Sequence, residues 1–260
     1  MTILSGGGGQ PKTSLLTAFG TNGFTLAEVL ITISIIGIVA AITLPALIQR
    51  NNNKVTEARL KKFYSVINQA VILSELENGD RKDWYRDYSG AVIDPDGKPI
   101  EGTSEAEKWF MQYIGKYLKI VGKETTDRGM FIVYFEDGSA LMQLNHGTTR
   151  DWVFYPQKVK RCVERYGYPT SITSGGLGVC AFAFGFVPGK PGQTQTEAEA
   201  TGFGFLYNKG FESYTYAWDG SREFLIEHCK DNSTKGVYCT MLIQLNNWQI
   251  PKDYPHKVSY

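Results

Sequence analysis

Glu28 is the residue of this chain whose chemistry most clearly requires a partner. It stands at the start of an apolar stretch, Val29 to Gln49, that contains no other ionisable side chain. A carboxylate within hydrocarbon costs about 3 kcal/mol on insertion scales. An ionisable residue in a membrane helix is a functional hypothesis by default, so Glu28 predicts a cationic partner.

The apolar stretch is long enough to cross a membrane. About 20 residues at about 1.5 Å each span about 30 Å, the thickness of a bilayer core. Isoleucine and valine are poor helix formers, but lipid forces the backbone to form its hydrogen bonds internally. The alternatives are an ordinary anchor and a secretory signal peptide. An anchor needs neither the carboxylate nor the preceding glycine, and no small-residue cleavage site follows the apolar run.

The sequence GFTLAEVLITISIIGIVAAITLPALIQ, residues 23–49, resembles the N-terminal signature of type IV prepilins and type II secretion pseudopilins. The resemblance implies that a prepilin peptidase cuts between Gly23 and Phe24 and that Phe24 is then N-methylated. Glu28 becomes the fifth residue of the mature chain, where the family has its assembly glutamate. Gly37 and Pro45 fall where the family keeps a helix-weakening glycine and proline.

The same resemblance implies a location. Family members begin as single-pass proteins of the inner membrane, with the C-terminal domain outside the cytoplasm, and then join a periplasmic or cell-surface filament. The positive-inside rule alone would place the C-terminal side in the cytoplasm, because basic residues follow the apolar stretch: Arg50, Lys54, Arg59, Lys61 and Lys62. We expect the family orientation, since a processed leader is cytoplasmic and these residues belong to an amphipathic helix.

Charge and length limit what the rest of the chain does. The 260 residues include 27 Lys and Arg against 26 Asp and Glu. Cleavage would remove Lys12, the one charged residue of the leader, and leave a neutral chain. A neutral chain is not suited to electrostatic binding of nucleic acid, so we expect no nucleic-acid partner. The residues after the apolar stretch are enough for one compact domain with its own core.

Periodicity predicts a small set of helices and strands. Apolar residues at helical spacing extend the membrane helix, so one helix is expected over 24–78, bent near Pro45 and ended by Gly79. Ser104 and Glu107 resemble a capping box that opens a second helix over 105–120. Segments 131–135 and 140–144 predict a hairpin. The other expected strands are 152–155, 181–187, 204–207, 214–218 and 237–245, and 188–202 is expected to be a loop.

Together with the resemblance, these elements predict an α+β, pilin-like fold. A long N-terminal helix, first transmembrane and then amphipathic, is expected to pack on an antiparallel β-sheet domain. The expected organisation is a prepilin leader at 1–23, a transmembrane and filament-core helix at 24–49, and an extracytoplasmic globular domain at 50–260.

The four cysteines lie in the part expected outside the cytoplasm, where disulfides persist. They allow three connectivities. We expect the sequence-local pairs, Cys162 with Cys180 and Cys229 with Cys239, each closing a loop worth about 3 kcal/mol. A metal site is the alternative, but there is no CxxC motif and the histidines are scattered. We therefore expect no metal, although His228 beside Cys229 gives a weak zinc signal.

Three further segments could bind a ligand, and each has a plainer interpretation. Asp94-Pro95-Asp96-Gly97 has oxygen ligands for calcium, but it lacks the spacing of a full calcium loop and is more typical of a turn. Gly175 to Gly178 is typical of a turn rather than a phosphate cradle. The aromatic residues could form a carbohydrate- or partner-binding face, but at strand alternation they more often pack in a core: Phe203, Phe205, Tyr207, Phe211, Tyr214, Tyr216 and Trp218.

The chain has none of the common enzyme signatures, so we expect no enzyme and no cofactor. The favoured function is a structural subunit of a type IV pilus-like or type II secretion pseudopilus filament. Its expected partners are other pilin or pseudopilin subunits, the prepilin peptidase and methyltransferase, the filament assembly platform and inner-membrane lipid. The alternative is a membrane-tethered, adhesin-like binding module or enzyme that keeps a prepilin-type anchor. Glu28 separates the two, because only assembly explains it.

Overall fold

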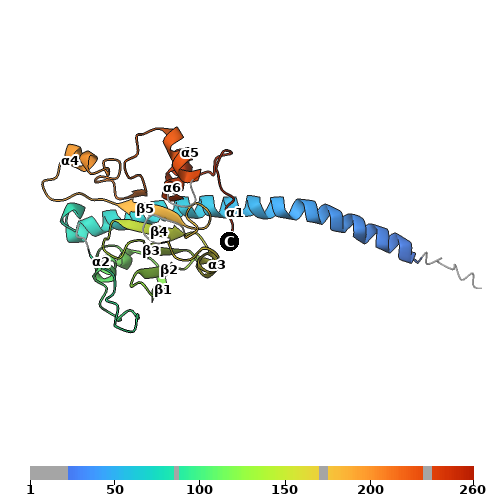
Figure 1. Cartoon of the computed structure of the whole chain (residues 1–260), viewed down its shortest axis with the longest axis horizontal. Helices are drawn as coiled ribbons and strands as arrows, with labels where there is room; N and C mark the ends of the chain where they lie inside the picture. The colour runs from blue at the N-terminus through green and yellow to red at the C-terminus, as the bar shows by residue number, and fades with distance from the viewer. Residues whose placement is uncertain (1–22, 85–87, 170–174, 231–235) are drawn as a thin grey trace, which may run out of the picture. The chain divides into compact units, whose positions relative to one another are not determined.

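The computed structural model describes residues 23–84, 88–169, 175–230 and 236–260. The chain divides into two compact units, Met1–Pro45 and Ala46–Tyr260. Helix α1, Leu26–Asn78, runs through both units, and a six-stranded antiparallel sheet follows it in the second (Figure 1). The predicted α+β class, with a long N-terminal helix and an antiparallel sheet, is confirmed.

Helix α1 has two different reasons to be helical. Its first part is apolar all round, as a membrane helix is. Its second part is amphipathic, and its buried residues recur at intervals of three and four: Thr56, Leu60, Phe63, Ile67, Ala70, Val71 and Ser74. The helix ends at Asn78 because Gly79 adopts the left-handed conformation, with φ +76°. The Gly79 N–H still donates to the Glu75 carbonyl at 3.1 Å, which closes the last turn.

The sheet is a simple meander in which each strand pairs with the next along the chain. Its strands are β1 (Ile120–Thr125), β2 (Phe131–Phe135), β3 (Ala140–Gln143), β4 (Asp151–Tyr155), β5 (Phe182–Phe186) and β6 (Phe211–Ser213). The predicted hairpin is β2–β3, in which Val133 pairs with Leu141. The remaining helices are α2 (Glu105–Tyr113), α3 (Val159–Tyr166), α4 (Gln195–Ala200), α5 (Arg222–Lys230) and α6 (Cys239–Leu245), with short 3-10 turns at Arg81–Asp83, Gly115–Tyr117 and Gly236–Tyr238.

Both faces of the sheet are covered. On the first face Phe63 of α1 stacks on Phe154 of β4 with ring centroids 4.1 Å apart, and Phe110 of α2 lies 5.3 Å from Trp152. The opposite face carries Val153 and packs against residues of α3, α5 and α6. Because both faces of the central strands are buried, β2, β4 and β5 consist almost entirely of apolar residues, whereas the edge strand β1 contains Lys123, Glu124 and Thr125.

One ion pair ties the β2–β3 turn to the second part of α1. The Lys62 Nζ atom lies 2.8 Å from Asp137 Oδ2. Burial opposes ionisation of Asp137, but hydrogen bonds from Lys62 and from Ser139 outweigh it and lower the pKa of Asp137 to about 2. The carboxylate is therefore charged at neutral pH and holds the turn against the helix.

The segment 237–245, predicted as a strand, is helical and forms a 3-10 turn followed by α6. A short apolar run does not distinguish a buried strand from a buried helix by its pattern alone. The helical form places Cys239 and Leu242, three residues apart, in the same core cluster, while Ile243 enters the core on the other face of the sheet. This tertiary packing decides the conformation.

The segments 204–207 and 214–218, also predicted as strands, form bridges and turns instead, and β6 lies between them. Positive φ angles at Asn208, Gly210 and Ala217, of 56°, 94° and 49°, interrupt the extended conformation. The loop predicted over 188–202 contains α4, which opens with a complete Thr194–Glu197 capping box.

The second helix is shorter than predicted, because α2 ends at Tyr113 rather than at 120. Gly115 is unfavourable in a helix interior. The β-branched residues Ile120 and Val121 begin β1, which is an edge strand. This strand was not predicted from the sequence. Ser104 caps α2 by accepting a hydrogen bond from the Glu107 N–H at 3.1 Å. The Glu107 carboxylate accepts from Lys123 Nζ at 2.6 Å instead of completing the predicted capping box.

Two disulfides join neighbouring elements of the globular unit. Cys162 of α3 is bonded to Cys180, just before β5, and Cys229 of α5 is bonded to Cys239 of α6. All four cysteines are buried. The second disulfide closes the α5–α6 connection. The C-terminal segment lies close to it, since His256 Nε2 is 2.5 Å from the Cys229 carbonyl oxygen.

The segment from Gly175 to Gly178 is a turn placed between the two disulfides. A Cβ atom on Gly176 would lie 2.6 Å from the sulfur of Cys180, and one on Gly178 would lie 2.6 Å from the sulfur of Cys239. Both glycines have positive φ, +73° and +79°. Glycine is therefore needed at both positions for backbone conformation and for space.

Candidate processing and assembly site

The predicted cleavage residues lie just before α1 begins. Gly23, Phe24 and Thr25 have no regular secondary structure, and the Phe24 side chain is 87% exposed. Among the described residues, nothing lies within 4 Å of the place where a Cβ atom on Gly23 would stand. No contact with the described part of the chain therefore limits the size of a side chain at this position.

Glu28 has a local role that the sequence analysis missed. Its Oε2 atom accepts hydrogen bonds from the Thr25 N–H and the Thr25 hydroxyl, each at 2.8 Å, and its own N–H donates to Thr25 Oγ1 at 3.2 Å. This is a capping box, and the Thr-x-x-Glu spacing before an apolar run is the sequence signal that would have found it. The box would survive cleavage, because both residues follow Gly23.

The capping box gives Glu28 a role within the chain but does not supply a partner for its charge. The two donors satisfy the carboxylate as a hydrogen-bond acceptor, so helix capping alone gives Glu28 a reason to exist in a plain anchor. They do not neutralise its charge, and among the described residues no cation forms an ion pair with Glu28. A charge inside hydrocarbon still favours a cationic partner.

The other polar side chains in the first part of α1 are hydrogen-bonded in a way that suits a lipid environment. Its three hydroxyl groups donate to carbonyls of the preceding turn: Thr32 to Val29 at 2.8 Å, Ser34 to Leu30 at 2.7 Å and Thr43 to Val39 at 2.9 Å. Such bonds remove the cost of placing a hydroxyl in hydrocarbon. Among the described residues, α1 is the one helix long and apolar enough to cross a membrane.

Gly37 and Pro45 both lie inside α1, and the helix continues past them. Pro45 has no N–H, so the Ala41 carbonyl loses its usual partner four residues on. Among the described residues, nothing lies within 4 Å of a Cβ atom built on Gly37. Each residue weakens the helix locally, and neither is required by a contact within the chain.

The other predicted candidates lie elsewhere and do not join this site. Asp94 forms a turn, in which its Oδ1 accepts from the Lys98 N–H at 2.7 Å and Gly97 has φ +78°. The Cys229 and Cys239 sulfurs lie near His256, with ligand atoms within 4.8 Å of one another. Those sulfurs are bonded to each other and are not thiolates, so they do not offer zinc ligands in this state. His228 instead stacks on Phe224, with ring centroids 3.7 Å apart.

Residues 20–44 match the prokaryotic N-terminal methylation motif. This match confirms the predicted relation to prepilins and pseudopilins and makes the chain a prepilin-peptidase substrate of that kind. With the apolar part of α1, it describes a single-pass, membrane-anchored protein.

No curated protein and no solved structure matches the chain. Its globular part does match a family, and the match starts at Ala46, the first residue of the second unit. Residues 46–258, well over half of the chain, match the family described as a family of unknown function (DUF6613), so the chain belongs to that family.

Proposed function

We propose that this protein is a structural subunit of a type IV pilus-like or type II secretion pseudopilus filament. The observation that carries the proposal is the methylation motif at residues 20–44, set on an apolar segment, residues 24–49, whose one ionisable side chain is Glu28. In this proposal the protein is a structural component rather than an enzyme, and its partners are other subunits, the prepilin peptidase and methyltransferase, and the assembly platform.

The proposal gives each residue of the motif a role. The peptidase cuts between Gly23 and Phe24 and removes residues 1–23, and the new amino group of Phe24 is methylated. Residues 24–49 then span the inner membrane and later form the filament core, in which Glu28 meets a cation. Gly37 and Pro45 provide weak points where the helix adapts to its neighbours. Residues 50–260 form the globular domain outside the cytoplasm.

The globular unit is compatible with this role. Its covered sheet and two disulfides are suited to an extracytoplasmic environment, where disulfides persist. Among the described residues nothing lies within 4 Å of a Cβ position on Gly23, so the site is accessible to a peptidase. A protein with these features begins as a membrane-anchored monomer and becomes a periplasmic or cell-surface filament subunit.

Processing provides the first prediction. The protein extracted from membranes of a host with active prepilin peptidase should have lost residues 1–23 and gained one methyl group on Phe24. Gly23→Leu should block the cut, because a large side chain replaces the glycine at the scissile bond, while the surroundings of Gly23 leave room for it. Intact-mass measurement distinguishes the forms. Recovery of only the full-length chain from the wild type, or normal cutting of Gly23→Leu, would contradict the proposed site.

Incorporation into a filament provides the second prediction. Mechanical shearing of the native host, or of a strain overproducing the assembly system, should release the mature chain with filaments that sediment and are visible by electron microscopy. Antibody against the globular domain should label those filaments along their length or at one end. A mature, methylated chain that stays with the membranes while filaments lack it would refute the structural role and favour the tethered module.

A further inference from the structure

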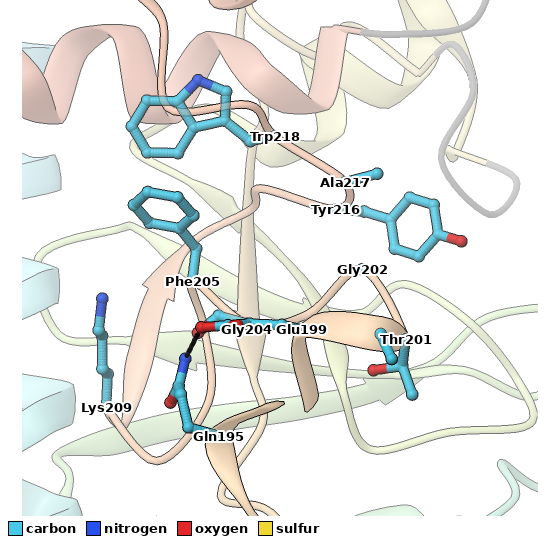
Figure 2. A pocket seen from close by; sticks show the side chains of 11 residues that line it. Gln195, Glu199, Thr201, Gly202, Gly204, Phe205, Lys209, Tyr216, Ala217 and Trp218 are labelled. Carbon is cyan, nitrogen blue, oxygen red and sulfur yellow. Dashed lines mark hydrogen bonds between the residues drawn. The ribbon is translucent and has the colours of Figure 1, made fainter. Parts of the chain in front are cut away.

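The structure divides the aromatic residues of 203–218 into two groups. Phe211 and Tyr214 are buried in the core. Phe205 and Tyr216, 41% and 43% exposed, are instead the two most exposed aromatic side chains among the described residues of the globular unit. Both line the same pocket, whose volume is about 610 Å³, within the usual range of ligand sites (Figure 2). Single exposed apolar residues are common, but here two large, partly exposed rings line the same pocket.

Contacts with other aromatic side chains order these two rings. Trp218 packs on Phe205 with ring centroids 4.3 Å apart, and its Nε1–H donates to the Ser221 carbonyl at 2.7 Å. The Tyr216 ring lies 4.9 Å from Phe203. Figure 2 shows Phe205 beneath Trp218, with Tyr216 apart from them across the hollow. Because these rings are already ordered, a ligand that stacks on them loses little free energy to their immobilisation.

Polar groups lie beside the rings. The Gln195 amide donates to Glu199 Oε1 and to the Gly204 carbonyl, each at 3.0 Å, which fixes the outer face of α4. Among the described residues, none donates to the second carboxylate oxygen of Glu199. The Thr201 hydroxyl donates to Ala198 and keeps its lone pairs as acceptors. The pocket therefore offers fixed hydrogen-bond acceptors next to exposed aromatic faces.

The charges in the pocket select against an ionic ligand. Glu199 carries the negative charge, and Lys209 carries a positive charge whose Nζ lies 5.2 Å from the Phe205 ring centroid. The lysine already occupies the cation-binding face of Phe205, so it repels a second cation. Glu199 attracts a cation but Lys209 repels it, and the reverse holds for an anion, so an ionic ligand gains little net electrostatic energy here. A ligand suited to this pocket is neutral, carries several hydroxyl groups and has an apolar face.

We propose that this pocket binds a neutral hexose unit of an oligosaccharide. The C–H face of one sugar ring lies on Tyr216, a neighbouring sugar of the same oligosaccharide contacts the exposed part of Phe205, and their hydroxyl groups donate to Glu199 and Thr201 and accept from Lys209. All of these residues belong to the unit Ala46–Tyr260, so the proposal does not depend on filament assembly. It adds glycan recognition to a protein whose filament role rests on the other unit.

The test uses the full-length protein in a detergent without a sugar headgroup, so that the detergent does not compete. Trp218 reports binding through its fluorescence, and calorimetry gives an independent affinity. The neutral probes are maltohexaose, cellohexaose, laminarihexaose and chitohexaose, and sialyllactose and choline are the ionic probes. At least one neutral probe should bind in the millimolar range or tighter.

Four variants locate the site. Tyr216→Ala and Phe205→Ala should each weaken binding at least about tenfold, a change of about 1.4 kcal/mol. Tyr216→Phe keeps the ring and should bind nearly as the wild type does. Leu76→Ala removes a side chain that is 80% exposed outside the pocket and should change nothing. Tyr216→Ala should remain folded, because the Tyr216 side chain lies at the surface and is 43% exposed, and thermal unfolding checks this.

The outcomes decide the proposal. Failure of every neutral oligosaccharide to bind at millimolar concentration would overturn it, as would unchanged affinity of Tyr216→Ala. Binding of sialyllactose or choline alone would overturn the assignment of a neutral ligand. Loss of binding in Tyr216→Ala with normal folding and normal filament incorporation would support a separate glycan site.

Discussion

Glu28→Val is expected to reduce filament incorporation on the order of a hundredfold while membrane insertion and leader cleavage survive. Cleavage after Gly23 creates an amino group on Phe24 with a reference pKa of about 7.7–8.0, so a large fraction is cationic near neutrality. Methylation keeps the amine basic. Removal of one partner of a buried ion pair costs about 3–5 kcal/mol, because the other charge is left alone. Valine should also ease insertion, since it removes a charge from the helix.

The cationic partner is expected to come from another subunit. In a staggered stack of helices, Glu28 of one subunit lies level with the Phe24 amine of the next. The unpaired charge then penalises the free monomer and favours the docked one, and the pairing fixes the axial register. Within one chain, Glu28 already accepts its hydrogen bonds from Thr25.

The capping box makes a second variant necessary. Glu28→Val removes the charge and the cap together, whereas Glu28→Gln removes the charge and keeps a residue that forms capping boxes. Thr25→Ala is the reverse control, because it removes the cap and keeps the charge. Loss of an N-cap costs about 1 kcal/mol, and the continuous helix and its lipid surroundings should tolerate it.

The measurement is the yield of sheared filaments from cells in which the variant is the sole copy of the subunit, with intact mass to check processing. We expect Glu28→Val and Glu28→Gln to fail and Thr25→Ala to retain most of the yield. Full yield from Glu28→Gln with loss in Thr25→Ala would assign Glu28 to capping alone. The charge pair would then not be the assembly device.

The sequence predicted the long helix and the β2–β3 hairpin because local pattern alone decides them. Leu60, Phe63 and Ile67 repeat at helical spacing, and the Asp137-Gly138 turn separates two apolar runs. The prediction for the segment 237–245 failed because its apolar run suits a strand as well as a helix, and the packing of Cys239, Leu242 and Ile243 in the two cores decides between them. Such packing over a distance has no local signal.

The prediction of the sites also depended on whether the signal is local in the sequence. The methylation motif is contiguous, so its resemblance to the prepilin signature was visible in the sequence, while the roles of Gly23, Phe24 and Glu28 stay predictions. The capping box was missed although its signal was present. The aromatic pocket could not be assigned, because Phe205 and Tyr216 look like strand residues in the sequence. Only the turns around Gly202 and Ala217 leave those two rings exposed, and the Ala217 N–H donates to the Gly202 carbonyl at 2.7 Å.

Gly178→Ala is expected to lower the free energy of unfolding of the globular unit by about 2–5 kcal/mol. An L-residue in the left-handed conformation costs about 1–2 kcal/mol, and overpacking in a core typically costs about 1–3 kcal/mol more. Both apply here, because Gly178 has φ +79° and its Cβ would lie 2.6 Å from the Cys239 sulfur and 3.0 Å from the His256 ring. Cys239 is fully buried within a disulfide and has little room to move.

Gly97→Ala separates the two contributions. Gly97 has φ +78°, nearly the angle of Gly178, but among the described residues nothing lies within 4 Å of its Cβ position. Its substitution should therefore show the conformational cost alone. Denaturant unfolding of both variants, followed by the fluorescence of buried tryptophans, gives the difference, and peptide mapping without reduction shows whether Cys229–Cys239 still forms. If Gly178→Ala loses no more stability than Gly97→Ala, the turn does not pack against the disulfide as described. A larger loss for Gly178→Ala, with the disulfide reduced or mispaired in part of the sample, is the expected result, because the turn must lie against the sulfur for the α5–α6 connection to close.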